Sequence, residues 1–126
     1  MESKKIKTFQ DLNTWKEAHK LVILIYKTTK QLPKEELFGL TSQIRRAAVS
    51  ITSNIAEGFS RQSYLEKAQF YSIAQGSTTE TQNQSLVAKD VGYISKDKYD
   101  KLADQAIVVH KLLSGLIKKS KAIHNS

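Results

Sequence analysis

The sequence predicts an all-α protein, an up-and-down bundle of four helices in a single domain spanning residues 1–126. Only one proline and five glycines punctuate the 126 residues, which favours long helices over a β architecture with many turns. Apolar residues recur at intervals of three or four along most of the chain, as in helices with one buried face. Short connections then make consecutive helices antiparallel neighbours. The helices are predicted at residues 13–32, 37–58, 63–91 and 96–119.

The first two helices carry clear signals at their ends. Asn13 is a good N-cap for the first helix, and Pro33 stops it. The apolar stripe of the second helix runs from Leu40 to Ile55 at helical spacing, and Gly58 is placed as its C-terminal stop. Periodicity and end signals therefore agree for both helices.

The third helix has the weakest pattern. Ser63 and Glu66 have the spacing of a capping box at its start, and Gly92 suits its end. Between Gln75 and Ser85 there is no large apolar residue, and the serine, threonine and glycine found there are poor helix formers. We predict a continuous helix, with a break in this segment as the alternative.

The fourth helix is clear, with Ser95 as its N-cap and a stripe from Tyr99 to Ile117. Lysines near its carboxyl end suit the negative end of the helix macrodipole. The first and fourth helices also carry apolar side chains beyond those that one bundle seam needs, which indicates self-association. These extra residues are Leu21, Leu24, Ile107, Val108 and Leu112.

The net charge of +8 is concentrated at the two ends of the chain. Residues 1–34 carry +5 and residues 111–126 carry +4. An up-and-down bundle brings both ends to one pole, so we predict a basic surface that binds RNA or DNA in a salt-dependent, sequence-independent way. Arg45, Arg46 and Arg61 are further candidate contacts, because guanidinium groups match phosphate geometry. The alternative is that the terminal lysines are solvated tails. The lysines concerned are Lys4, Lys5, Lys7, Lys118, Lys119 and Lys121.

Residue patterns of catalysis and metal binding are missing from the sequence. There is no cysteine, no Glu-x-x-His pair of the kind that builds di-metal sites in bundles, no Gly-x-Ser-x-Gly elbow and no glycine-rich phosphate loop. We therefore expect a protein that is not an enzyme and that uses no metal or cofactor. With no signal peptide and no apolar run near the roughly 18 residues of a membrane span, we expect a cytoplasmic protein with no membrane role.

Polar residues form a ridge beside the apolar stripe of the second helix. Helical spacing relates Gln43, Ser50, Asn54 and Glu57, and the third helix offers Glu80 opposite them. Networks of this kind between helices or subunits fix register when every member is satisfied. We expect a structural polar network in which the two glutamates pair with arginines of the same or a neighbouring subunit.

Four stretches of sequence carry a family resemblance: Phe9-x-x-Leu12-x-x-Trp15-Lys16, the turn Leu32-Pro33-x-Glu35, residues 43–58 and residues 70–80. Together they resemble a bacterial family known as four helix bundle proteins, which includes the proteins encoded within intervening sequences of 23S ribosomal RNA genes. The resemblance implies a barrel-like homopentamer. The related accessory proteins of diversity-generating retroelements look like basic pentamers that bind nucleic acid and a reverse transcriptase, so the resemblance implies RNA or DNA, and a partner protein, as partners.

The leading hypothesis is a non-enzymatic homo-oligomer that binds RNA or DNA through its basic pole as an accessory or scaffold. The alternative is a protein–protein interaction module with no nucleic-acid role, in which the lysines serve solubility. Salt-dependent binding of nucleic acid distinguishes the two hypotheses.

Overall fold

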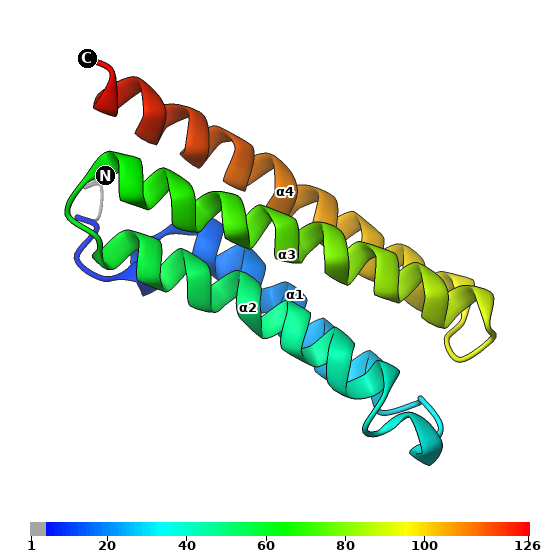
Figure 1. Ribbon diagram of the computed structural model, residues 1–126. Helices are drawn as coiled ribbons and strands as arrows, with labels where there is room; N and C mark the ends of the chain where they lie inside the picture. The colour runs from blue at the N-terminus through cyan, green and yellow to red at the C-terminus, as the bar shows by residue number, and fades with distance from the viewer. Residues whose placement is uncertain (1–4) are drawn as a thin grey trace.

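Four antiparallel α-helices make up the computed structural model, which describes residues 5–126 (Figure 1). Each helix packs on its neighbours in sequence, and the first also packs on the fourth, so the bundle closes into a ring. Within the described range no residue belongs to a strand. The predicted all-α fold with four helices is confirmed. The helices are α1 (Asn13–Thr29), α2 (Leu40–Ser60), α3 (Tyr64–Asp90) and α4 (Lys96–His124), and two 3-10 turns, η1 (Phe9–Asp11) and η2 (Lys34–Glu36), precede α1 and α2.

The helix ends differ from the predicted ones by a few residues. α1 stops at Thr29, before the turn that Pro33 enforces. α2 starts at Leu40, where the Glu36 carboxylate accepts the Leu40 backbone N–H at 3.2 Å. α4 continues to His124, beyond the predicted end at residue 119, because neither proline nor glycine occurs between residues 119 and 124.

α3 runs unbroken through the segment that lacks large apolar residues. Thr78, Thr81 and Ser85 lie buried, and each hydroxyl donates to the carbonyl of the residue four positions earlier, at 2.8–2.9 Å. A buried hydroxyl that is satisfied inside its own helix leaves no unpaired polar atom. The small side chains of this face therefore let α2 and α4 approach α3 closely without interrupting it.

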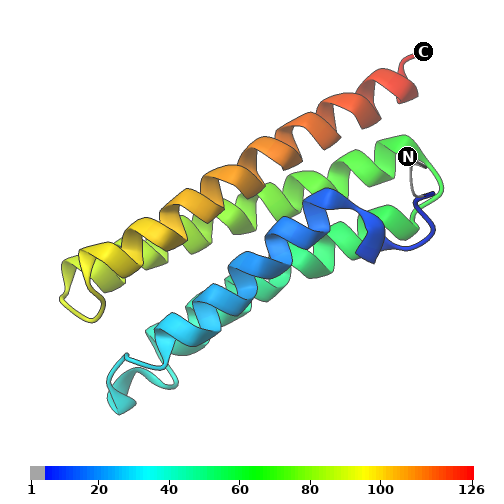
Figure 2. The ribbon, with the colours of Figure 1, turned by 180° about the vertical axis from the view of Figure 1, so that it is seen from behind.

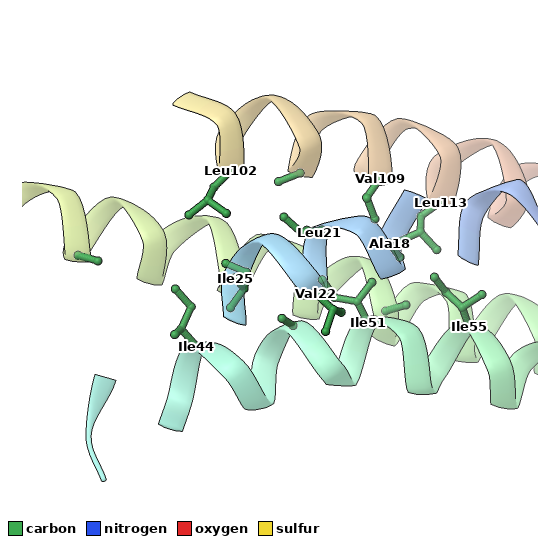
Figure 3. Packing of buried hydrophobic residues seen from close by; sticks show 14 of the residues in the cluster. Ala18, Leu21, Val22, Ile25, Ile44, Ile51, Ile55, Leu102, Val109 and Leu113 are labelled. Atoms are coloured by element: carbon green, nitrogen blue, oxygen red, sulfur yellow. The ribbon is translucent and has the colours of Figure 1, made fainter. Parts of the chain in front are cut away.

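Large aliphatic side chains of α1, α2 and α4 fill the core, and α3 contributes mainly alanines (Figure 3). Ala74 and Ala88 of α3 are buried against these larger residues. Large residues on three helices and small ones on the fourth interdigitate at close-packed density. The fully buried large residues include Leu21, Ile25, Ile44, Ile51, Ile55, Leu102, Val109 and Leu113.

Each of the four seams between neighbouring helices carries at least one side-chain hydrogen bond. Since such bonds have strict distance and angle requirements, they fix how far one helix can slide along the next. They are Arg45 Nε to Thr29 Oγ1 (2.9 Å) between α2 and α1, Ser50 Oγ with Ser77 Oγ (2.9 Å) between α2 and α3, Gln75 Nε2 to Ser114 Oγ (2.7 Å) between α3 and α4, and Gln105 Nε2 to the Glu17 carbonyl (2.8 Å) between α4 and α1.

Gly58 lies inside α2 and does not end it, which corrects the predicted helix stop. The helix continues to Ser60, and Gly58 has no positive φ. A Cβ atom at this position would lie 2.7 Å from the Tyr71 ring and 3.0 Å from the Phe70 Cβ. The glycine is needed for close approach of α3 and not for turn geometry.

Gly58→Ala should destabilise the fold by about 1–3 kcal/mol, because the added methyl group overpacks the contact with Tyr71. Gly115→Ala is the matched control, since nothing lies within 4 Å of the Cβ position there. It should stabilise α4 by about 0.5–1 kcal/mol through helix propensity. Urea denaturation followed by circular dichroism measures both, and equal stability of Gly58→Ala and wild type would contradict the packing argument.

Candidate nucleic-acid interface

The segment before α1, from residue 5, and the end of α4 lie at the same end of the bundle (Figures 1 and 2). Ile6 and Ile123 line one common pocket, which places the two terminal segments next to each other. Lys4 lies outside the described residues, and the other five predicted lysines are exposed: Lys5, Lys7, Lys118, Lys119 and Lys121. We call this end, made of residues 5–16, 57–67 and 116–126, the basic pole.

The basic pole has few carboxylates for its cations. It contains eight basic residues and three acidic ones, whereas the far end, residues 27–46 and 89–104, contains nine basic and six acidic residues. Cations at the far end are also paired, as in Lys96 Nζ to Asp100 Oδ2 at 2.8 Å. A larger uncompensated positive potential therefore lies at the pole where the chain begins and ends.

Of the three predicted arginines, only Arg61 belongs to the basic pole. Its guanidinium lies over the Phe70 ring, 4.6 Å from the centroid, and forms an exposed ion pair with Glu57 at 3.3 Å. Arg45 belongs to the far end, where it bonds to Thr29 and stacks on an aromatic ring of α1. Arg46 is exposed, but because it is next to Arg45 in α2 it also lies at the far end. The fold therefore does not bring Arg45 and Arg46 together with the terminal lysines.

Lys67 is a cation of the basic pole that the sequence analysis missed. Its ammonium donates to the Phe59 carbonyl at 2.6 Å, which satisfies a carbonyl at the end of α2. Burial lowers the pKa of Lys67, and its Nζ lies 5.9 Å from the centroid of the Tyr64 ring. The available signal was a lysine one turn after Ser63, close enough in sequence to reach back across the short connection.

A pocket of about 260 Å³ opens at the basic pole, between the terminal segments and the α2–α3 connection. Three of its residues are aromatic and four are aliphatic, and two lysines belong to its wall. We call it the pole pocket. Its lining residues are Ile6, Leu12, Phe59, Tyr64, Lys67, Tyr71, Leu116, Lys119, Ser120 and Ile123.

The predicted polar network exists in a smaller form. Ser50 bonds to Ser77 at 2.9 Å, and Asn54 Nδ2 donates to the Ser50 carbonyl and hydroxyl at 2.8 and 3.1 Å. Glu57 pairs with an arginine as expected, Arg61, but on the surface and outside this network, whereas Glu80 accepts a bond from Gln84 within α3 and pairs with no arginine. Gln43 is exposed. Sequence spacing identified the ridge but not which of its members face α3.

The described part of the chain contains neither a metal-binding group nor a membrane-spanning helix. Residues 5–126 contain no group of three or more histidine, aspartate or glutamate side chains placed to hold a metal ion. None of the helices found there has the length and apolarity to cross a membrane. The basic pole and its pocket are the candidate site, because exposed lysines and aromatic side chains meet there.

Comparison with known proteins gives a family match over most of the chain. Residues 10–115 match the family model of the 23S rRNA-intervening sequence proteins. Among solved structures, a protein with unknown function from the S23 ribosomal protein family of Bacteroides thetaiotaomicron superposes with a TM-score of 0.77 at 25% identity, covering 83% of this chain and 95% of that one. A search of curated proteins found no match.

The Ser50 hydroxyl and the Glu57 carboxylate should differ in their effect on stability. Ser50→Ala removes the partner of the buried Ser77 hydroxyl and should cost about 1 kcal/mol. Glu57→Gln breaks an exposed i,i+4 ion pair, and such pairs contribute little, so the urea midpoint should stay at the wild-type value. Equal losses in the two variants would show that Glu57 belongs to the buried network after all.

Proposed function

Because the chain belongs to the 23S rRNA-intervening sequence protein family, we propose that it is a non-enzymatic, homo-oligomeric accessory or scaffold protein that binds RNA or DNA through the basic pole. The observation that carries this proposal is the convergence of lysines from both chain ends on one pole with few carboxylates. Exposed ammonium groups on flexible stems follow a phosphate backbone without reading its bases. Binding of this kind releases counterions and weakens as salt rises.

Exposed apolar side chains support the homo-oligomer. Ile107 of α4 is 46% exposed, and Val108 and Ile73 are exposed on α4 and α3. Large apolar side chains in water favour association between copies. The sequence resemblance implies five copies in a barrel. A ring would repeat the basic pole once per subunit and so multiply the positive charge available to one nucleic-acid strand.

Replacing the three lysines at the end of α4, Lys118, Lys119 and Lys121, with alanine should reduce the slope of log affinity against log salt by about 2.1 to 2.7, at roughly 0.7–0.9 per lost phosphate contact. The matched control replaces Lys96, Lys98 and Lys101 at the other end of the same helix and should leave the slope unchanged. Fluorescence anisotropy with mixed-sequence RNA and DNA measures both. Wild-type protein that binds neither at low salt would contradict the proposal and favour the protein-interaction module.

Ile107→Glu should dissociate the oligomer, because it places a charge in an apolar contact between subunits. Ile23→Glu tests α1 in the same way, since Ile23 has a similar exposure of 41%. Light scattering coupled to size-exclusion chromatography gives the mass of each variant. Dissociation by Ile23→Glu alone would place the interface on α1, and a monomeric wild type would contradict self-association.

A further inference from the structure

The pole pocket presents aromatic side chains from the end of α2 and the start of α3. Phe59 closes α2, Tyr64 opens α3, and Tyr71 follows two turns later. Tyr64 is 42% exposed, while Tyr71 is only 2% exposed. Aromatic faces next to a cationic surface are the combination with which proteins stack the bases of single-stranded nucleic acids.

Tyr71 also supplies a hydrogen-bonding group to the pocket. The residue is almost fully buried and belongs to the pocket wall. Burial, together with the neighbouring Tyr64, raises the pKa of Tyr71 to about 12. Its hydroxyl is protonated at neutral pH, as that of an ordinary tyrosine is. The Ser120 hydroxyl donates to the Leu116 carbonyl at 2.8 Å and retains its acceptor lone pairs. A planar polar edge entering the pocket would meet both groups.

The size of the pocket suits a group smaller than a whole small molecule. Its volume of about 260 Å³ lies just below the range of about 300–1,000 Å³ that is usual for sites that enclose a whole small molecule. Lys119 belongs to the wall, and Lys5 and Lys7 flank the pocket residue Ile6 in sequence. Cations therefore lie where the phosphates on either side of an inserted base would pass.

We propose that the pole pocket takes one unpaired base of a single-stranded nucleic acid, which stacks on Tyr64 or Phe59 and presents its edge to Tyr71. This inference rests on the proposed function and adds a preference for strands over duplexes. Bases of a duplex are already paired and stacked, and withdrawing one costs free energy that a single strand does not spend. The basic pole alone would attract both forms.

The test compares the affinity of the full chain for a short thymidine homopolymer with its affinity for a duplex of the same length, by fluorescence anisotropy at one low salt concentration. Tyr64→Ala should weaken strand binding about tenfold and leave duplex binding unchanged. Tyr64→Phe, which keeps the ring, should retain strand binding. Tyr26→Ala is the matched control, because Tyr26 is a tyrosine of similar exposure, 40%, at the far end of the bundle.

A second measurement uses the unmodified protein, so that it does not depend on the folding of any variant. A thymidine strand carrying one thiothymidine should crosslink under ultraviolet light to Phe59, Tyr64 or Tyr71. Equal affinity for strand and duplex, unchanged by Tyr64→Ala and with crosslinks elsewhere, would overturn the base pocket and leave the basic-pole function standing. Absence of binding to both forms would overturn the proposed function together with the inference.

Discussion

The buried face of α3 is the constraint on which the rest of the bundle depends. It carries alanines and hydroxyl side chains where a bundle helix would ordinarily carry leucines. The hydroxyls of Thr78, Thr81 and Ser85 are satisfied within the helix, and that of Ser77 bonds to Ser50 of α2. The face is therefore polar in composition but leaves none of these hydroxyls unpaired. The aliphatic residues of the other three helices fill the space that small side chains leave. The Ser50–Ser77 bond and the contact of Tyr71 with Gly58 both require this short distance between α2 and α3.

The even number of antiparallel helices decides where the charge accumulates. At the basic pole the positive ends of α1 and α3 lie beside the negative ends of α2 and α4, so the helix dipoles largely cancel. The net positive potential of this pole therefore comes from side chains. The ammonium group of Lys67, a residue of α3, lies at the carboxyl end of α2. The last lysines of the chain lie at the carboxyl end of α4. Cations stabilise a helix at this end. In the proposed function, the lysines that suit these helix ends are the ones that attract phosphate.

Sequence periodicity predicted the four helices because their apolar stripes are regular, and it predicted α3 despite the gap in large residues. The ends were less accurate, since Glu36 caps α2 through its side chain and Gly58 proved to be a packing position. The common pole of the terminal lysines followed from topology. The partner of each polar group could not be predicted from the sequence. Ser50 and Asn54 lie towards α3, whereas Glu57 and Glu80, at related spacing, lie on the surface. Tyr71 and the pole pocket depend on which residues meet across a helix connection, and no local pattern encodes that. Lys67 could have been found only from its spacing after Ser63.

The contact between Gly58 and Tyr71 ties a backbone position to the shape of a surface cavity. Tyr71 belongs to the wall of the pole pocket, and the missing side chain at position 58 is what allows its ring to sit against α2. A larger residue at 58 would push the ring outward and make the pocket shallower, unless residue 71 became smaller at the same time. Residues 58 and 71 can therefore change only together. Residue 58 does not line the pole pocket, yet its size sets how deep the pocket is.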